Sequence, residues 1–535
     1  MAENAIMTED ESCSYDEIPY QSDPFPQTHP GVLSTIATLF GMQPPPVDHC
    51  RVLEIGCAAG GNLMPMALEL PESTFVGIDL SGRQIGEAKE TAKILGLQNV
   101  KFQKANVMEI GPDFGEFDYI ITHGVYSWVP RPVADKIMEV SVKNLSPNGV
   151  SYISYNTLPG WHMRGMIRDM MCYHTKQFAR PQIRVRQARA LLKFLADSVP
   201  GEKNPYGIYL KNELEFLQKM RESYIYHEHL EKENNPIYFY QFVERAEAAG
   251  LQYVGEAAFG AMAQAAHDLP ANVMATLQQV SPHLINREQY MDFVRNRTFR
   301  QTLLCHKEVT LDHSLKPEYM TSLFAASPAK PVAAAADVSA KDPLEFRLPA
   351  GLTVPIRQPI TKAAMMHLSE IWPRGIAFND LRTSARARLD PKAQPDEVAA
   401  SRDGHSLAAS FQSLYALGLI ELSTRELPTS PKLSERPVAS PLVRLQAQRG
   451  HVVTNRRHRG VGVDELERRV LEYLDGHHDR GQIQEILEGL VANGSLVVKK
   501  GPEGGTPTAG DVTKIISESL DRGLSRFEQC QLLIG

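Results

Sequence analysis

The chain has 535 residues, which allows roughly three to four domains of about 150 residues each. Its composition, 43% hydrophobic and 22% charged, excludes a mostly disordered, collagen-like or coiled-coil protein. The 56 basic and 63 acidic residues give a net charge of -7, which excludes binding of nucleic acid or anionic membrane through overall charge. Nucleic-acid binding is therefore not expected unless a local patch provides it.

The sequence shows no signature of export or of a membrane span. Its first twenty residues are acidic and lack the basic start and apolar run of a secretory signal. No run of eighteen apolar residues occurs, so we expect no spanning helix. The six cysteines are scattered without a CxxC pair, which fits neither a disulfide framework nor a zinc site. We therefore expect reduced thiols, a cytoplasmic location and no metal.

The first part of the chain is predicted to be an open α/β sheet. Residues 1–30 are polar and rich in proline, which indicates an arm. Over residues 31–159, apolar β-branched runs alternate with helical patterns, which is typical of βαβ units with parallel strands. One intervening helix is well marked, with Ser81 as its N-cap and Gly96 at its end. Right-handed crossovers bring the carboxyl ends of such strands to one edge, where ligands bind.

Helical and then extended patterns follow this region. Residues 160–235 are helical and amphipathic, which predicts an inserted cap. Within residues 236–315, the runs 251–257 and 298–309 are extended, and we expect them to complete the sheet at its edge. The Ala- and Pro-rich composition of residues 316–343 predicts a linker.

Two small modules are predicted after this linker. Residues 344–430 contain a helix, a tight turn at Gly418 and an apolar strand, an order that indicates a winged helix. Residues 431–535 repeat the pattern weakly, with Asn493 and Gly494 at the turn and LVVKK as the expected strand.

The turn after the first predicted strand carries the most specific signal for a ligand. It reads LEIGCAAGGN over residues 53–62, and its glycines allow the backbone to turn sharply and approach a ligand at a helix N-terminus. Ala58 breaks a strict GxGxxG pattern. Glu54 would repel a dinucleotide pyrophosphate but attract a cation, which favours S-adenosylmethionine over NAD or FAD.

Two further strand ends support a nucleoside site. Asp79 ends the second strand, where a carboxylate can accept hydrogen bonds from both ribose hydroxyls. Asn106 ends the third strand, where its amide can bond the adenine edge while Val107 packs on the ring. A loop-capping role for Asn106 is the structural alternative. The arm is a further candidate, with Tyr20 closing the adenosyl pocket, and a disordered tail is its alternative.

Aromatic residues follow the fourth and fifth predicted strands. The segments HGVYSWVP (123–130) and YNTLPGW (155–161) both lie at the ligand edge. Methyl transfer is an in-line displacement on a sulfonium, so it is favoured by alignment and by electron-rich rings that face the cation. The alternative is that these aromatics belong to the core beneath the cap. His123 is either a base for an attacking amine or a residue that orients the cofactor.

These segments together carry a resemblance to a known family. The chain resembles class I S-adenosylmethionine-dependent methyltransferases, and more narrowly the rickettsial-type protein-lysine methyltransferases with a methyltransferase regulatory domain. The resemblance implies an α/β fold, with a Rossmann-like seven-stranded methyltransferase core, a helical cap insertion and C-terminal winged-helix-like α+β modules. It spans residues 15–310 and rests on YDEIPYQSDPFPQTHP, LEIGCAAGGN, VGIDLS, HGVYSWVP, SYNTLPGW and HEHLEKENNPIYFYQFVERAEAAGL.

The resemblance also implies an activity and a set of site residues. The expected reaction is methylation of lysine side chains in a protein substrate, with S-adenosylmethionine as the cofactor. Asn106 departs from the Asp that is commoner in such enzymes, which leaves the adenine contact open. The predicted catalytic residues are His123, Tyr126, Trp128, Tyr155, Asn156 and Trp161. The predicted cofactor-binding residues are Glu54, Gly56, Cys57, Ala58, Gly60, Asn62, Asp79, Leu80, Asn106, Val107 and His123.

The sequence leaves alternatives to protein methylation open. An [DN]PP[YF] tetrapeptide is absent after the fourth strand, which weighs against the base and glutamine methyltransferases but does not distinguish protein amines from small-molecule amines. A small-molecule methyltransferase is therefore the first alternative. A cofactor-binding regulator or adaptor without catalysis is the second, and a homodimer is also left open.

Two weaker signals receive structural interpretations. His227 and His229 lack HExxH spacing, so we expect a solvated or lid-packing helix and not a metal site. Arg456, Arg457 and Arg459 form a short basic stretch, which we expect to be a solvated loop and not a phosphate-binding site.

Overall fold

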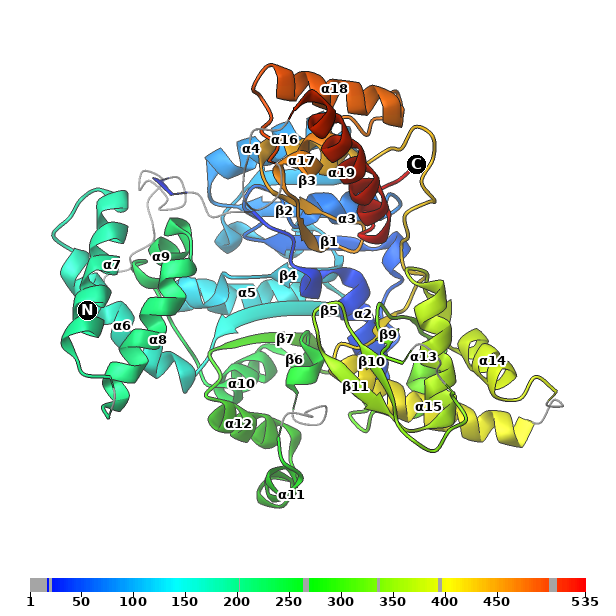
Figure 1. Cartoon of the computed structure of the whole chain (residues 1–535). Helices are drawn as coiled ribbons and strands as arrows, with labels where there is room; N and C mark the ends of the chain where they lie inside the picture. Colours follow the sequence, from blue (N-terminus) through cyan, green and yellow to red (C-terminus); the bar gives the residue numbers. More distant parts are fainter. Residues whose placement is uncertain are drawn as a thin grey trace, which may run out of the picture.

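A seven-stranded mixed sheet forms the centre of the molecule, and helical modules surround it (Figure 1). Among the helices described, none is both long and apolar enough to cross a membrane. The structure, a computed structural model, describes residues 17–18, 22–201, 203–262, 269–333, 337–392, 397–499 and 508–535.

The strand order of the central sheet is β3-β2-β1-β4-β5-β7-β6. Strands β1 to β5 pair in parallel, whereas β7 runs antiparallel to both β5 and β6. The two extended runs predicted after the cap are β6 and β7, so the prediction that they complete the sheet at its edge is confirmed. The bounds are β1 Arg51–Ile55, β2 Thr74–Asp79, β3 Val100–Lys104, β4 Phe117–Thr122, β5 Leu145–Asn156, β6 Leu251–Glu256 and β7 Phe299–His306.

Helix α4 (Gly82–Ile94) joins β2 to β3 and begins where the sequence predicts. The Ser81 hydroxyl accepts a hydrogen bond from the Gln84 backbone N–H at 3.1 Å, which satisfies one donor of the open helix end. Gly96 follows the helix with φ +69°. The buried face has helical spacing and comprises Ile85, Ala88 and Ala92. The other helices between β1 and β5, and the one before β1, are α2 Pro30–Leu39, α3 Leu63–Glu69 and α5 Arg131–Lys143.

The predicted cap is confirmed as a group of four helices at one side of the sheet (Figure 1). It has an apolar core of its own, separate from that of the sheet. The helices are α6 Gly160–Thr175, α7 Pro181–Ser198, α8 Pro205–Lys219 and α9 Glu222–His229.

Three further helices accompany the last two strands of the sheet. Helix α10 (Phe239–Ala249) ends at Gly250, whose φ of +106° allows the chain to turn directly into β6. Helix α12 packs against α10 and leads to β7. Their bounds are α11 Ala271–Val280 and α12 Leu284–Arg295.

The stretch predicted to be a linker is instead part of the folded core. Residues 316–343 contain the short helix η8 (Pro317–Ser322) and the strands β8 (Phe324–Ala326) and β9 (Lys330–Pro331). Ala325, Ala326 and Ala329 are fully buried. The linker prediction is wrong here because alanine has too little apolar surface to give a strong sequence signal, yet its small side chain lets backbones approach closely.

The next module shares one hydrophobic core with the central sheet. Its helix α15 (Glu397–Ala416) is followed by Gly418 at φ +70° and by β13 (Glu421–Ser423), which confirms the predicted helix, turn and strand. Strand β13 pairs with β8, on the other side of which lies β12. The remaining elements are β10 Leu344–Arg347, β11 Thr353–Ile356, α13 Pro359–Ile371, β12 Ile376–Ala377 and α14 Phe378–Leu389.

The C-terminal module has a separate core and covers the end of the sheet formed by β1 to β3 (Figure 1). The strand expected after Gly494 does not form within the described residues, which reach Lys499. Leu496 is buried and Val497 is 77% exposed. The elements are α16 Pro441–Arg449, β14 Val452–Thr454, β15 Gly460–Gly462, α17 Glu465–Glu472, α18 Arg480–Ala492 and α19 Ala509–Gln529.

Candidate active site

The turn between β1 and α3 adopts the strained conformation that the sequence predicts. Gly56 and Gly60 have φ values of +78° and +75°, and a Cβ at Gly56 would clash with the side chain of Val125. Ala58 has φ +49°, a left-handed conformation that is rare for a residue with a side chain. Strain of this kind collects at functional sites. The turn therefore reaches the required shape without a third glycine.

Asp79, at the end of β2, holds this turn in place. Its carboxylate accepts hydrogen bonds from the backbone N–H groups of Ala58 and Ser81, each at 2.9 Å. One bond fixes the strained residue of the turn and the other fixes the start of α4. The side chain remains partly exposed at the carboxyl edge of the sheet, where ligands of such sheets bind.

Glu54 is a buried carboxylate with one oxygen in use and one without a partner. Its Oε1 accepts a hydrogen bond from Asn62 Nδ2 at 2.7 Å, whereas Oε2 has no hydrogen-bond partner within the described residues. Burial, together with a smaller effect of the nearby charge of Asp79, raises the pKa of Glu54 to about 8. A cationic ligand would donate the hydrogen bond that Glu54 Oε2 lacks, so the site fits the ammonium of S-adenosylmethionine.

Asn62 joins three distant parts of the chain, and we call Phe25, Thr28, Glu54, Asn62 and His458 the Asn62 junction. The amide oxygen of Asn62 accepts a hydrogen bond from the Phe25 N–H at 2.9 Å and lies 2.8 Å from His458 Nε2. Its Nδ2 donates to Thr28 Oγ1 at 2.9 Å. Asn62 is only 2% exposed. Asn62 was predicted to bind the cofactor, and in this structure its Nδ2 donates to Glu54 Oε1.

The arm lies against the glycine-rich turn in its described part. The N–H of Gly61 donates to Ser22 Oγ at 2.7 Å, and a Cβ at Gly61 would clash with the Ser22 backbone. The Phe25 ring lies 4.0 Å from that of His123, measured between centroids. Tyr20, for which a pocket-closing role was predicted, lies outside the described residues.

The remaining predicted cofactor residues occupy different positions. The Cys57 side chain is buried against Gly77, so only the backbone of Cys57 is available to a ligand. Asn106 Oδ1 accepts a hydrogen bond from the Met108 N–H at 3.0 Å, which is the loop-capping geometry. Val107 is largely buried beside it, whereas Leu80 is 47% exposed.

His123 follows β4 and is held as a neutral imidazole. Its Nδ1 lies 2.8 Å from the Tyr152 hydroxyl. Burial lowers the pKa of His123 to about 4. A group with so low a pKa is a weak base near neutral pH, so this environment favours the orienting role over the base role.

Tyr126 and Tyr155 lie in the core and not at the exposed edge. Tyr155 is 1% exposed and stacks on Phe242 with 3.9 Å between ring centroids. Tyr126 is 2% exposed and contacts the same two rings edge-on. Burial of both side chains favours a structural role, and the catalytic role predicted for these two residues stays a prediction. The alternative, core aromatics beneath the cap, describes both.

The two tryptophans and Asn156 meet where the sheet joins the cap. Trp128 is partly exposed, and its ring lies edge-on to that of Trp161 with 6.0 Å between centroids. Trp161 is buried in the first turn of α6. Asn156 is also buried, and its Nδ2 donates to Asn234 Oδ1 at 3.0 Å. Of these three predicted catalytic residues, Trp128 is the one that reaches the surface.

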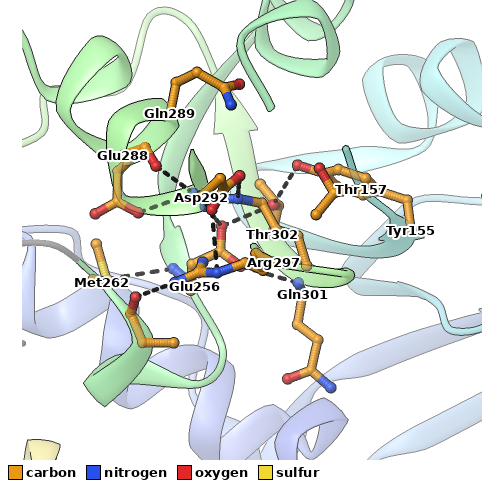
Figure 2. Close-up of polar contacts among 12 residues, drawn as sticks. Tyr155, Thr157, Glu256, Met262, Glu288, Gln289, Asp292, Arg297, Gln301 and Thr302 are labelled. Carbon is orange, nitrogen blue, oxygen red and sulfur yellow. Dashed lines mark hydrogen bonds and ion pairs between the residues drawn. The ribbon is translucent and has the colours of Figure 1, made fainter. Parts of the chain in front are cut away.

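The Tyr155 hydroxyl leads to a buried ionic network that the sequence did not indicate. It lies 3.1 Å from Thr302 Oγ1, which donates to Glu256 Oε1 at 3.0 Å. Arg300 lies among three buried carboxylates, and Figure 2 shows these acidic side chains converging from β6 and α12. We call Arg300, Thr302, Glu256, Glu288 and Asp292 the Arg300 cluster.

Every nitrogen of the Arg300 guanidinium has a partner. Nε and Nη2 donate to the two oxygens of Asp292 at 2.8 Å, Nη1 donates to Glu256 at 2.6 Å, and Nη2 also bonds Glu288 at 3.1 Å. The guanidinium also lies 3.7 Å from the centroid of the Phe239 ring. No motif could reveal this cluster, because its members come from separate elements.

The histidine pair in α9 is packed inside the structure. His227 Nε2 lies 2.6 Å from the Ile18 carbonyl oxygen, and its Nδ1 lies 2.9 Å from Glu231 Oε1. His229 is 2% exposed. Of the two expected possibilities, a solvated helix and a packed one, α9 is therefore the packed one. It also contacts the backbone of the arm residue Ile18.

The basic stretch is not the solvated loop that the sequence suggested. The Arg457 side chain is 5% exposed, forms an ion pair with Glu421 and stacks over Trp372. Arg456 forms an ion pair with Glu69 of α3 at 3.5 Å. These arginines face acidic groups of neighbouring modules, which the local sequence does not reveal.

Comparison with known proteins agrees with this geometry. Family models match residues 46–197 (a methyltransferase domain), 221–306 (a predicted methyltransferase regulatory domain) and 435–532 (the C-terminal winged helix domain of PKMT). The protein RP789 of Rickettsia prowazekii (strain Madrid E) is 38% identical over 493 residues, which cover 91% of this chain and 87% of RP789.

Solved structures extend the match to the whole fold. PKMT2 from Rickettsia typhi superposes with a TM-score of 0.84 at 30% identity, covering 97% of this chain and 100% of that one. The same protein in complex with AdoHcy gives the same TM-score at 31% identity. The chain belongs to this PKMT family. It is an S-adenosylmethionine-dependent methyltransferase with the predicted seven-stranded core and C-terminal winged helix.

Proposed function

We propose that this PKMT-family enzyme methylates lysine side chains of a protein substrate. The observation that carries the proposal is the match to PKMT2, which extends over the cap and both C-terminal modules and is not limited to the cofactor-binding core. A shared core would indicate only a methyltransferase. A match that includes the cap and both C-terminal modules supports a shared class of acceptor.

The cofactor is proposed to lie across the carboxyl ends of β1 to β3. Glu54 Oε2 would accept a hydrogen bond from the ammonium, and Asp79 would accept from the ribose hydroxyls. Val107 would pack against the adenine ring. Bound there, the cofactor supplies an electrophilic methyl group on a sulfonium. The chain contributes position, because alignment is the main requirement of an in-line displacement.

The acceptor is proposed to approach beside Trp128, where the sheet meets the cap. The ring of Trp128 lies edge-on to that of Trp161, and an indole face stabilises a nearby cation by about 0.5–2 kcal/mol. His123 would orient the cofactor, since its low pKa makes it unsuited to deprotonate a lysine ammonium. Attack requires the neutral amine, so we infer that the acceptor reaches the site after losing its proton to solvent.

We further propose that the enzyme works in a reducing, cytoplasmic compartment. The described cysteines Cys50, Cys57, Cys172, Cys305 and Cys530 are all free thiols. Exported proteins of this size usually protect their cysteines in disulfides.

The test is a labelling experiment with methyl-tritiated S-adenosylmethionine. The enzyme is incubated with a cell lysate, which is then separated into protein and small-molecule fractions. We expect label in protein, and methyl-lysine after acid hydrolysis. The control is Asp79→Ala, which should weaken cofactor binding by about 1–3 kcal/mol through loss of the hydrogen bonds that the carboxylate makes.

The outcomes separate the three functions considered. Label confined to the small-molecule fraction would establish the small-molecule alternative. Binding of the cofactor without transfer to either fraction would support a regulator or adaptor. Labelled protein that yields methylated residues other than lysine would retain the protein substrate but remove the lysine assignment.

A further inference from the structure

A histidine of the C-terminal module contacts the end of the cofactor turn. His458 lies in the loop between β14 and β15, 396 residues from Asn62 in sequence, and its Nε2 is 2.8 Å from Asn62 Oδ1. It is 4% exposed and has φ +59°, in the left-handed region. A histidine held in this strained conformation needs surrounding structure to maintain it.

The loop that carries His458 is firmly anchored. Asn455 Oδ1 accepts hydrogen bonds from the N–H groups of Arg457 and Arg459 at 3.0 and 2.9 Å, and its Nδ2 donates to the Cys530 carbonyl at 2.9 Å. Arg457 is paired with Glu421 of the preceding module. His458 is therefore presented to the turn by a rigid support that belongs to two modules.

Hydrogen bonding fixes which atoms of the junction donate and which accept. The Phe25 backbone N–H can only donate, so the atom that it contacts must be the amide oxygen of Asn62. This places Nδ2 toward Glu54 Oε1. It also requires His458 to carry its proton on Nε2 and to donate to the same oxygen. The neutral tautomer agrees with burial, which lowers the pKa of His458.

We propose that His458 is a positioning residue for cofactor binding, acting through the Asn62 amide on the Glu54 carboxylate. With Oδ1 held by His458 and Phe25, the amide cannot rotate, and Nδ2 fixes Oε1 of Glu54. Oε2 is then presented toward the carboxyl edge of the sheet. The C-terminal winged helix module thereby becomes part of the cofactor site without touching the cofactor.

The test compares two substitutions at one position. His458→Asn suits the left-handed backbone, because Asn tolerates that conformation, but its shorter amide cannot reach Asn62. His458→Gln places an amide N–H near the position of Nε2. His451→Asn, on the same hairpin with a 63% exposed side chain, is the control. Affinity for S-adenosylhomocysteine is measured by calorimetry, and thermal unfolding verifies the fold of each variant.

We expect His458→Asn to weaken S-adenosylhomocysteine binding roughly tenfold, as expected when a buried hydrogen bond loses one partner. His458→Gln should remain within about threefold of the native affinity, given its retained donor. His451→Asn should bind normally. In turnover assays, His458→Asn should raise the cofactor KM and leave kcat nearly unchanged. Native affinity in His458→Asn, or equal losses in the Asn and Gln variants, would overturn the proposal.

Two further measurements keep the proposal testable if a variant is unstable. In the Asn62→Ala background, His458→Asn should cause no additional loss of affinity, because its effect passes through Asn62. Fully additive losses would contradict this. In the native enzyme, S-adenosylhomocysteine should slow hydrogen exchange of the loop amides at 455–459, which do not belong to the cofactor turn. An unchanged exchange rate there would also overturn the proposal.

Discussion

The molecule contains two buried polar networks, which lie toward opposite ends of the same sheet and differ in how completely they are satisfied. In the Arg300 cluster every guanidinium nitrogen has a carboxylate partner. In the Asn62 junction, Glu54 Oε2 and His458 Nδ1 have no partner among the residues that the structure describes. A buried polar atom without a partner is costly, so each such atom calls for an explanation, and a missing ligand is one of them. We therefore expect the Arg300 cluster to serve stability, and under the proposed function the ammonium of the cofactor would complete the Asn62 junction.

The largest effect is expected from Arg300→Met in the complete network. The substitution leaves Glu256 and Glu288 without the cation that pairs with them, and Asp292 keeps only its ion pair with Arg297. Breaking a buried ion pair in this way costs about 3–5 kcal/mol. Urea denaturation followed by circular dichroism would show a lower midpoint. The control is Arg131→Met, which removes an exposed pair with Asp135 and should change stability by less than about 0.5 kcal/mol. Equal midpoints for the two variants would show that the cluster is not structural.

The opposite pattern is expected for Glu54→Gln in the incomplete network. Loss of a hydrogen bond to a charged group should weaken S-adenosylhomocysteine binding by about 1.5–3 kcal/mol. Stability of the free enzyme should be unchanged or higher, because the raised pKa of Glu54 shows that its ionised form is disfavoured. Glu116→Gln, at a 55% exposed side chain, is the control for both measurements. A destabilised Glu54→Gln that binds normally would reverse the assignment of the two networks.

A pH dependence should distinguish the networks further. The free enzyme holds a proton on Glu54 below pH about 8, and a bound ammonium favours the ionised carboxylate. Binding of S-adenosylhomocysteine at pH 7 should therefore release a proton, and affinity should rise toward pH about 8. The stability of the free enzyme should change with pH in the opposite direction to its affinity. Because the pKa of Glu54 is higher in the folded than in the unfolded state, its contribution to the free energy of unfolding is fully present below the unfolded pKa. This contribution is lost as the pH rises to about 8.

Calorimetry in buffers of different ionisation enthalpy measures this proton release. Glu54→Gln should release less than the native enzyme, and its stability should lack the same slope between pH 5 and 8. If the variant and the native enzyme release equal numbers of protons, another group is responsible for the coupling.

The smallest effect is expected from Tyr126→Phe. The hydroxyl is buried beside Tyr155 and Phe242 and does not reach the exposed edge of the sheet, so turnover should change by less than about twofold. Steady-state kinetics with a methylated protein substrate would measure it. A large loss of kcat with unchanged KM would restore the catalytic role that the sequence suggested for this residue.

Sequence patterns predicted the parts of the fold that depend on local periodicity. The helix from Ser81 to Gly96 and the edge strands β6 and β7 carry their signals in neighbouring residues. The predicted linker and the strand after Gly494 failed because the deciding factor was a distant partner. The buried alanines lie in and beside β8, which pairs with β12 and β13. The segment that contains the exposed Val497 pairs with no strand among the described residues.

The residues of the candidate site also differ in whether local sequence patterns could predict them. Glu54 and Asp79 could be selected because their positions at strand ends follow from the βαβ pattern. The buried Tyr126 and Tyr155 could not be distinguished from the partly exposed Trp128. The sequence indicates which strand end a residue follows, but it does not indicate how deeply the side chain is buried. The contact of His458 with Asn62 had no sequence signal at all, since it joins modules that are distant along the chain.

The shared core of the sheet and the module after it has a consequence for how the enzyme can be divided. Buried residues such as Leu323, Phe378 and Phe411 belong to the same apolar cluster as the methyltransferase strands. Cutting the chain near residue 315 would expose this surface on both fragments. We therefore expect the sheet and the module that ends near residue 430 to unfold together, whereas the cap has an apolar core of its own. The C-terminal module, which has its own core, is the part that evolution or an engineer could exchange as a separate piece.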